Sequence, residues 1–193
     1  LVVADSGLTV VGSRGNVSTP SPGLALLDGD GLLVGDDALR NARLKPRRVH
    51  SRFWQLLDTH PLGRPFPGHL RTADLAHAHL CDVWRRIGRQ PNEIILVVPG
   101  VYSAEQLGLL LGVAAAAEIP VRGMVDLAVA AAADRAIRRR CLHLDLHLHR
   151  AVLTEIEHGS EVVRGRVWEN DGVGLSGLHD LWARTVASLF VRQ

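Results

Sequence analysis

The middle of the chain alternates strand patterns with helix patterns, and this alternation limits the folds that the chain can adopt. Ile94–Val98 is a continuous run of five apolar residues, which predicts a strand buried on both faces. Ser103 and Gln106 then form a capping box that begins a helix. A short strand at 119–121 and an alanine-rich helix over 125–136 follow. Strand, helix, strand and helix in this order predict an α/β fold with parallel strands and right-handed crossovers.

The first part of the chain carries the pattern of an antiparallel sheet with helices after it. Residues 1–4 and 8–11 are expected to pair, and Asp28-Gly29-Asp30-Gly31 is typical of a hairpin turn. The further elements that the patterns predict are strands at 24–27 and 32–34, helices at 38–44 and 72–88, and loops at 13–23 and 45–67.

A similar order of elements returns near the end of the chain, where three strands at 141–145, 151–156 and 162–167 precede a helix at 178–191. We therefore predict two lobes with a weak internal duplication. Lobe I covers 1–138 and holds a mixed sheet with helices on both faces and a shortened peripheral insertion at about 45–70. An incomplete lobe II covers 139–193. Because the sequence starts at Leu1 and ends inside a helix pattern, we expect it to be a fragment of a longer protein.

Composition argues against several classes of protein. The chain has 22 Lys and Arg against 20 Asp and Glu, and its arginines are scattered, so no nucleic-acid partner is expected. The longest apolar run, at 107–117, is shorter than the roughly 18 residues of a membrane span, so no membrane association is expected. The only two cysteines lie far apart, which favours a reducing compartment and hence a cytoplasmic protein.

Five stretches of the sequence occur in an order and spacing that suggest one family. They are Asp28-Gly29 with Leu33-Val34-Gly35-Asp36-Asp37-Ala38 and Asn41; Leu96-Val97-Val98-Pro99-Gly100-Val101-Tyr102 with Gln106; Asp126 with Ala130-Ala131-Ala132; Leu144-Asp145-Leu146; and Gly174 with Leu178. Together they resemble the nucleotide-binding domain of DnaK-type heat-shock chaperones, which belong to the actin-like ATPases. The resemblance implies a ribonuclease-H-like, actin-type ATPase fold in which ATP lies between two lobes.

In that family two glycine-rich hairpins wrap the phosphates of ATP, because backbone amides must come close to the phosphate oxygens. By the resemblance, Asp5, Gly7 and Thr9 would contact phosphate from the first hairpin, and Gly174 would do so from a helix start.

The resemblance also implies the residues that would hold the metal and catalyse hydrolysis. Asp5 and Asp145 would hold a hydrated magnesium ion. Asp126 would orient the attacking water, and Arg52 stands where the family has a catalytic lysine.

The sequence departs from the family where the phosphates would lie. Leu8 replaces a hydroxyl residue in the first hairpin, and His147-Leu148-His149 replace three glycines in the second. Leu175 replaces one of two glycines at the helix start. We therefore expect a divergent chaperone ATPase domain with degenerate phosphate loops, in which ATP hydrolysis is poor or absent.

Two other functions remain open. The first is a non-catalytic module that retains the fold to bind a protein partner or client, or a second copy of itself, because an incomplete lobe exposes apolar surface. The second is a metal-binding strand. Cys141, His143, Asp145, His147 and His149 alternate with leucines and would share one face of a strand, where Cys141, His143 and His147 suit zinc. Without a metal, that polar face would be the solvent-facing half of an ordinary strand.

Overall fold

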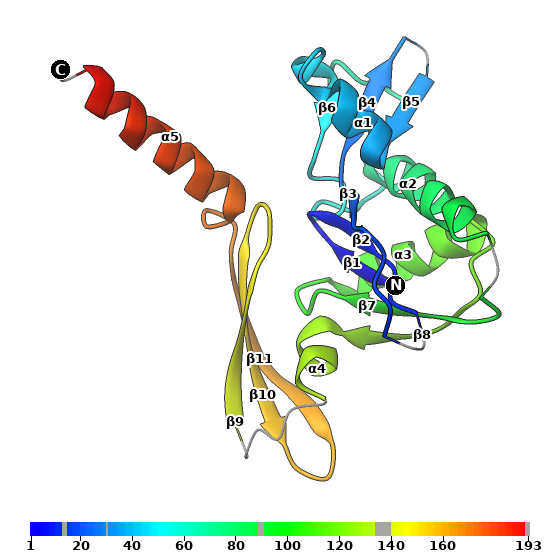
Figure 1. Ribbon diagram of the computed structural model, residues 1–193. Coiled ribbons are helices and arrows are strands. Elements are labelled where there is room, and N and C mark those ends of the chain that lie inside the picture. Colours follow the sequence, from blue (N-terminus) through cyan, green and yellow to red (C-terminus); the bar gives the residue numbers. More distant parts are fainter. Residues whose placement is uncertain (13–14, 30, 89–90, 134–139, 192–193) are drawn as a thin grey trace. The chain divides into compact units, whose positions relative to one another are not determined.

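The computed structural model describes residues 1–12, 15–29, 31–88, 91–133 and 140–191 (Figure 1). It is a mixed α/β structure, as predicted. The chain divides into two compact units, Leu1–Leu127 and Ala128–Gln193. The predicted lobe boundary, between residues 138 and 139, falls in a stretch outside the described residues.

The first unit is built on a five-stranded sheet in the order β3-β2-β1-β7-β8. These strands are β1 (Val2–Ala4), β2 (Gly7–Thr9), β3 (Ser21–Pro22), β7 (Ile94–Val98) and β8 (Val121–Asp126). The pairs β1–β2 and β2–β3 are antiparallel, whereas β1–β7 and β7–β8 are parallel. The predicted parallel pairing in the middle of the chain is therefore confirmed.

Helices α2 (Thr72–Arg86) and α3 (Ala104–Ala116) contact each other and supply core residues that pack with the sheet. The predicted capping box begins α3: the Gln106 amide donates to Ser103 Oγ (3.2 Å), and the Ser103 amide donates to Gln106 Oε1 (3.1 Å). Strand β7 alternates between buried and more exposed residues, and Ile95 is 55% exposed. The prediction that this strand is buried on both faces is therefore wrong: Leu96 lies in the core with residues of α2 and α3, whereas Ile95 is on the exposed face.

A smaller sheet, in the order β5-β4-β6, completes the first unit. It consists of β4 (Ala25–Asp28), β5 (Gly31–Val34) and β6 (Val49–His50), with α1 (Gly35–Ala42) after β5 and a short 3₁₀ turn, η1 (Pro46–Arg48), before β6. The stretch that was expected to form a shortened insertion supplies four large core residues: Phe53, Trp54, Leu57 and Phe66. Its side chains therefore pack inside the unit even though its backbone is largely irregular.

His79 of α2 joins three parts of the first unit by hydrogen bonds. Its side chain is fully buried, and Trp54 Nε1 donates to its Nδ1 (3.0 Å). Since Nδ1 accepts this bond, Nε2 carries the ring proton and donates to Ser21 Oγ (2.8 Å). Burial lowers the pKa of His79 to about 4, so the imidazole is neutral in the folded protein at physiological pH.

The second unit consists of a short helix, a three-stranded antiparallel meander and a long helix. The elements are α4 (Leu127–Ala132), β9 (Arg140–Leu146), β10 (Ala151–His158), β11 (Val162–Asn170) and α5 (Leu175–Val191), with sheet order β11-β10-β9. The three predicted strands and the predicted helix are confirmed. Within the described residues, no helix is long and apolar enough to cross a membrane.

The two faces of the meander are covered and exposed in the opposite way to the prediction. Cys141, His143 and Asp145 lie on the half-buried face of β9, whereas Leu144 is 67% exposed on the other face. The polar face is covered because α4 packs its alanines against the side of the sheet that carries Cys141 and Ile156. The expectation that these polar residues form a solvent-facing half is therefore wrong, and the leucines face outward instead.

We expect acid to destabilise the first unit through His79. In the unfolded chain its pKa is the ordinary 6.5, whereas in the fold it is about 4. Between these values the unfolded state binds more protons, so stability falls as the pH drops, by about 2–3 kcal/mol between pH 7 and pH 4.5. We would measure the free energy of unfolding in urea at pH 7 and at pH 4.5. Between these pH values, the decrease for His79→Gln should be smaller than that for the wild type by about 2–3 kcal/mol. The exposed control His69→Gln should behave like the wild type, and an equal pH dependence in all three proteins would contradict the prediction.

Candidate functional site

The carboxyl ends of three parallel strands meet at one edge of the five-stranded sheet. Asp5 directly follows β1, and Asp126 is the last residue of β8, opposite Val98 of β7. Asp5 is buried and Asp126 is half-buried. In open α/β sheets this edge is where ligands bind. The structure therefore places two of the predicted site residues, Asp5 and Asp126, along the same edge, although Asp126 ends a strand rather than lying in the expected helix.

The first predicted phosphate hairpin is a tight β-hairpin with Asp5 and Ser6 in its turn. Gly7 has a φ of 138°, and a Cβ there would lie 2.0 Å from the carbonyl oxygen of Ser21. Packing against β3 is therefore enough to require glycine at this position. Thr9 pairs with Val2, at the far end of the hairpin from Asp5. The structure thus brings Asp5 and Gly7 together and leaves Thr9 away from the carboxyl edge.

Arg52 is exposed and precedes a stretch that is fixed beside the carboxyl end of β7. Tyr102, which follows β7, donates its hydroxyl hydrogen to the backbone carbonyl of Trp54. Gln106 Nε2 donates to the carbonyl of Gln55 (3.2 Å). These bonds hold the backbone that follows Arg52 near the sheet edge that carries Asp5.

The second predicted phosphate hairpin lies in the other unit and is a turn that is packed against a helix. β9 ends at Leu146, so His147 and His149 lie in the turn and not on the strand. His147 is buried, with Nε2 3.0 Å from Asp145 Oδ2. The amides of Leu175 and Ser176, at the start of α5, donate to the carbonyls of His147 (3.0 Å) and Leu148 (2.9 Å).

Gly174 allows this close contact between α5 and the turn. A Cβ at Gly174 would lie 2.6 Å from the amide nitrogen of Arg150 and 2.7 Å from the carbonyl oxygen of Leu148. Free amides at a helix start normally attract phosphate. Here two of them are bonded to the turn that replaces the glycine loop, so they are not available to a triphosphate.

The sequence also suggested a metal-binding strand on β9. In the part of the chain that the structure describes, no group of three or more His, Cys, Asp or Glu side chains is placed to hold a metal ion. Cys141 and His143 lie on β9, whereas His147 lies beyond its end. The three residues that were expected to bind zinc are therefore not on one strand face.

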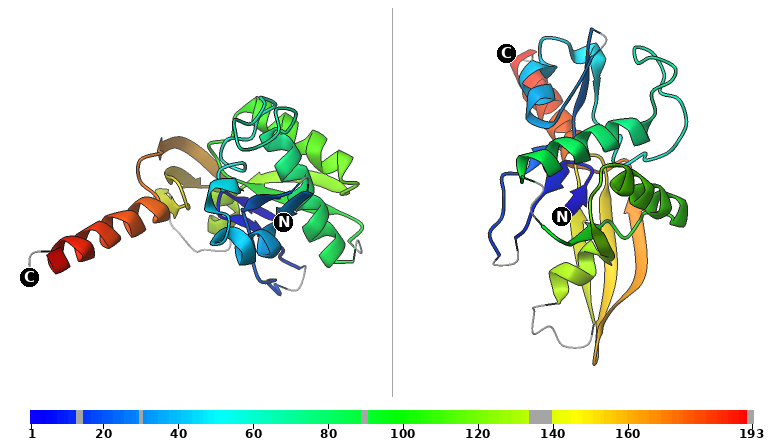
Figure 2. Two further views of the ribbon diagram at one scale, coloured as in Figure 1. Left: turned by 90° about the horizontal axis from the view of Figure 1, so that it is seen from above. Right: turned by 90° about the vertical axis from the view of Figure 1, so that its right-hand side faces the viewer.

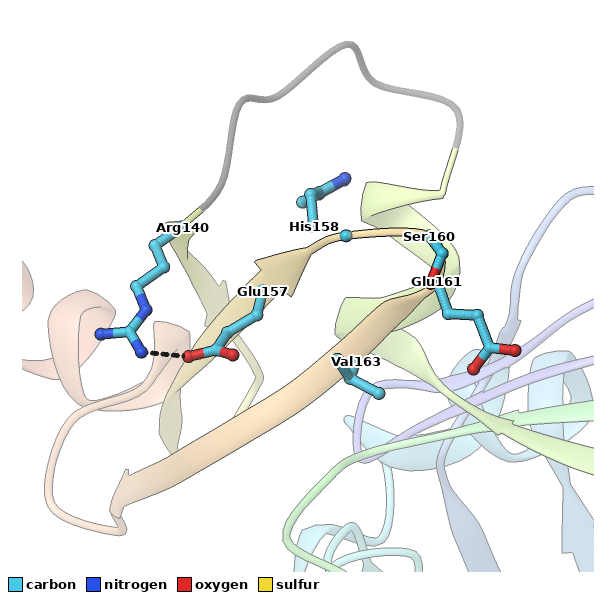
Figure 3. Close-up of a pocket in the computed structure, with 7 residues that line it drawn as sticks. Arg140, Glu157, His158, Ser160, Glu161 and Val163 are labelled. Atoms are coloured by element: carbon cyan, nitrogen blue, oxygen red, sulfur yellow. Dashed lines mark ion pairs between the residues drawn. The ribbon is translucent and has the colours of Figure 1, made fainter.

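A hollow of about 480 Å³, not indicated by the sequence, lies at the turn between β10 and β11 (Figure 3). Arg140 and Glu157 form an ion pair of 2.6 Å at its margin, and His158, Ser160 and Glu161 line it. Since β10 runs from Ala151 to His158, this hollow is at the opposite end of the strand from the His147 turn. Within this unit it is therefore separate from Gly174 and the turn after β9.

No protein-family model matches the sequence, and no curated protein matches it. The strand order of the main sheet, its carboxyl edge and the turn after β9 are therefore the features that bear on function.

Gly7→Ala should destabilise the first unit by about 3 kcal/mol or more, because the new methyl group would collide with backbone at an unfavourable φ. Gly108→Ala is the matched control, because no atom lies within 4 Å of a Cβ at this exposed helical position. It should stabilise the protein by about 0.5–1 kcal/mol. Urea unfolding measures both changes, and a neutral effect of Gly7→Ala would show that β3 does not pack as described.

Proposed function

We propose that this chain is a divergent nucleotide-binding domain of the DnaK type in which ATP hydrolysis is poor or absent. The sheet order supports this origin. Along the sequence, the first three strands of the main sheet are antiparallel neighbours, and the next two extend it in parallel from β1. This is the arrangement implied by a ribonuclease-H-like, actin-type lobe. In the second unit, a meander followed by a helix matches the start of a second such lobe.

The main support for poor or absent ATP hydrolysis is that the start of α5 is hydrogen-bonded to the turn after β9. A triphosphate needs backbone amides and open space at this turn. The turn instead contains the buried His147, and the amides of Leu175 and Ser176 already donate to its carbonyls. These residues do not fit the triphosphate of ATP.

The carboxylates are better preserved than the phosphate loops. Asp5 and Asp126 share the carboxyl edge of the main sheet in the first unit. Carboxylates of this kind bind magnesium with its water shell, but the affinity of such sites normally depends on the phosphates as well. Weak metal binding without hydrolysis is therefore the activity that this set of residues supports.

The alternative function, a module that binds other proteins, is favoured by a different observation. The outer face of β9 and nearly all of α5 expose large apolar side chains, among them Leu144 and Trp182. Exposed apolar surface of this extent normally marks an interaction site. The two functions are compatible, because a domain that has lost catalysis can retain its fold for binding.

We expect no ATP turnover that depends on the carboxyl edge. Phosphate release from magnesium-ATP by the wild type should equal that of Asp126→Asn and of the exposed control Asp180→Asn. Titration calorimetry with magnesium-ATP should show no binding in the micromolar range. Phosphate release that Asp126→Asn abolishes and Asp180→Asn retains would show that the site is a working ATPase.

A further inference from the structure

One face of the meander is an exposed apolar surface that crosses all three strands. Leu144 of β9 is opposite Leu153 of β10, and Leu153 is opposite Trp168 of β11, so the three side chains form one row. Leu142 and Leu146 extend the row along β9. These five residues form what we call the leucine face. Leu144 is 67% exposed and Trp168 is 47% exposed. Glu155, opposite Leu142, lies at one end of this surface.

Helix α5 carries a second apolar surface. Large apolar residues recur every three or four positions along α5, so they share one side of the helix. They are Leu175, Leu178, Trp182, Val186 and Leu189. We call this row the α5 stripe. None of the residues from Leu175 to Val191 is buried, and Trp182 is 63% exposed. In proteins most of the stability of such a helix comes from packing of its apolar side against another element.

The α5 stripe does not pack on the leucine face of its own chain. The two amide bonds to His147 and Leu148 and the close contact at Gly174 fix the start of the helix at the end of the meander. From there α5 runs away from the strands, as Figure 1 and the left view of Figure 2 show. Each chain therefore presents an apolar helix side and an apolar sheet face that do not meet.

We propose that two copies of this chain form a dimer in which the α5 stripe of each copy packs on the leucine face of the other. Helix on sheet is a standard way to bury two apolar surfaces, and two-fold symmetry makes the contact occur twice. The ten side chains in a contact range from half-buried (Leu153, Leu178) to well exposed (Leu144, Trp182). If each loses on average roughly 80 Å² of exposed area, the two contacts bury on the order of 1,600 Å². This area is sufficient for a stable, specific interface. Asp180 and Arg184, on the opposite side of α5, stay in water.

The first test is the mass of the wild-type protein by light scattering over a range of concentrations. We expect a dimer at micromolar concentration. A wild type that remains monomeric at high micromolar concentration would overturn the proposal, because the two surfaces would then be unpaired or covered within one chain.

Single substitutions then test each surface. Val186→Lys in the α5 stripe and Leu144→Glu in the leucine face should each weaken dimer formation at least about thirtyfold. The matched controls are Ala187→Lys, on the other side of α5, and Ser160→Glu, in the exposed turn after β10; both should remain dimeric. Circular dichroism should show the same strand content in all four variants, and any loss of helix should be confined to the two variants that no longer dimerise. A dimer that tolerates both Val186→Lys and Leu144→Glu would contradict the interface.

Mixing the two interface variants tests the exchange itself. In a dimer of one Val186→Lys chain and one Leu144→Glu chain, one contact has two unchanged surfaces, and the other pairs a new cation with a new anion. We therefore expect the two separately monomeric variants to form a heterodimer when mixed. Failure to do so would overturn the reciprocal arrangement. The result is independent of the ATP proposal, because dimer mass and phosphate release are measured separately.

Discussion

The contact between the start of α5 and the turn after β9 determines most of what the second unit can do. The amides of Leu175 and Ser176 donate to the carbonyls of that turn, and Gly174 lets the two backbones touch. The same bonds have two consequences. They occupy the amides that a phosphate-binding helix start would offer, and they set the direction in which α5 leaves the meander. The engagement of these amides and the exposure of an apolar helix therefore have one physical cause.

The first unit depends on the hydrogen bonds that hold its irregular segment around Trp54 against the rest of the fold. The stretch around Trp54 has little regular structure, yet it is fixed to α2 through His79 and to the chain after β7 through Tyr102. The buried imidazole is neutral because charging it inside the core is unfavourable, and its two hydrogen bonds satisfy both ring nitrogens. This network holds the irregular segment beside the carboxyl edge of the sheet.

Much of this fold was predictable because it depends on local signals. The apolar run of β7 and the capping box at Ser103 specify a strand and a helix start, and two parallel crossovers then follow from their order. The segment around Phe53 and Trp54 was not recognised as part of the core, because its buried side chains follow neither a helical nor a strand period. Asp126 was expected in a helix because the alanines after it dominate the local pattern, yet register with β7 extends the strand as far as that residue.

The candidate site was predictable only in part, for a reason that β9 illustrates. Alternation along a strand shows which side chains share a face, but not which face is covered. The alanines of α4 pack on the side that carries Cys141 and Ile156, so that side is covered and the leucines remain outside. The sequence pattern of one strand does not predict which of its faces another element will cover. A sheet with half-buried polar residues and exposed leucines presents apolar area to solvent rather than metal or phosphate ligands, and this is why we propose a polypeptide as its partner.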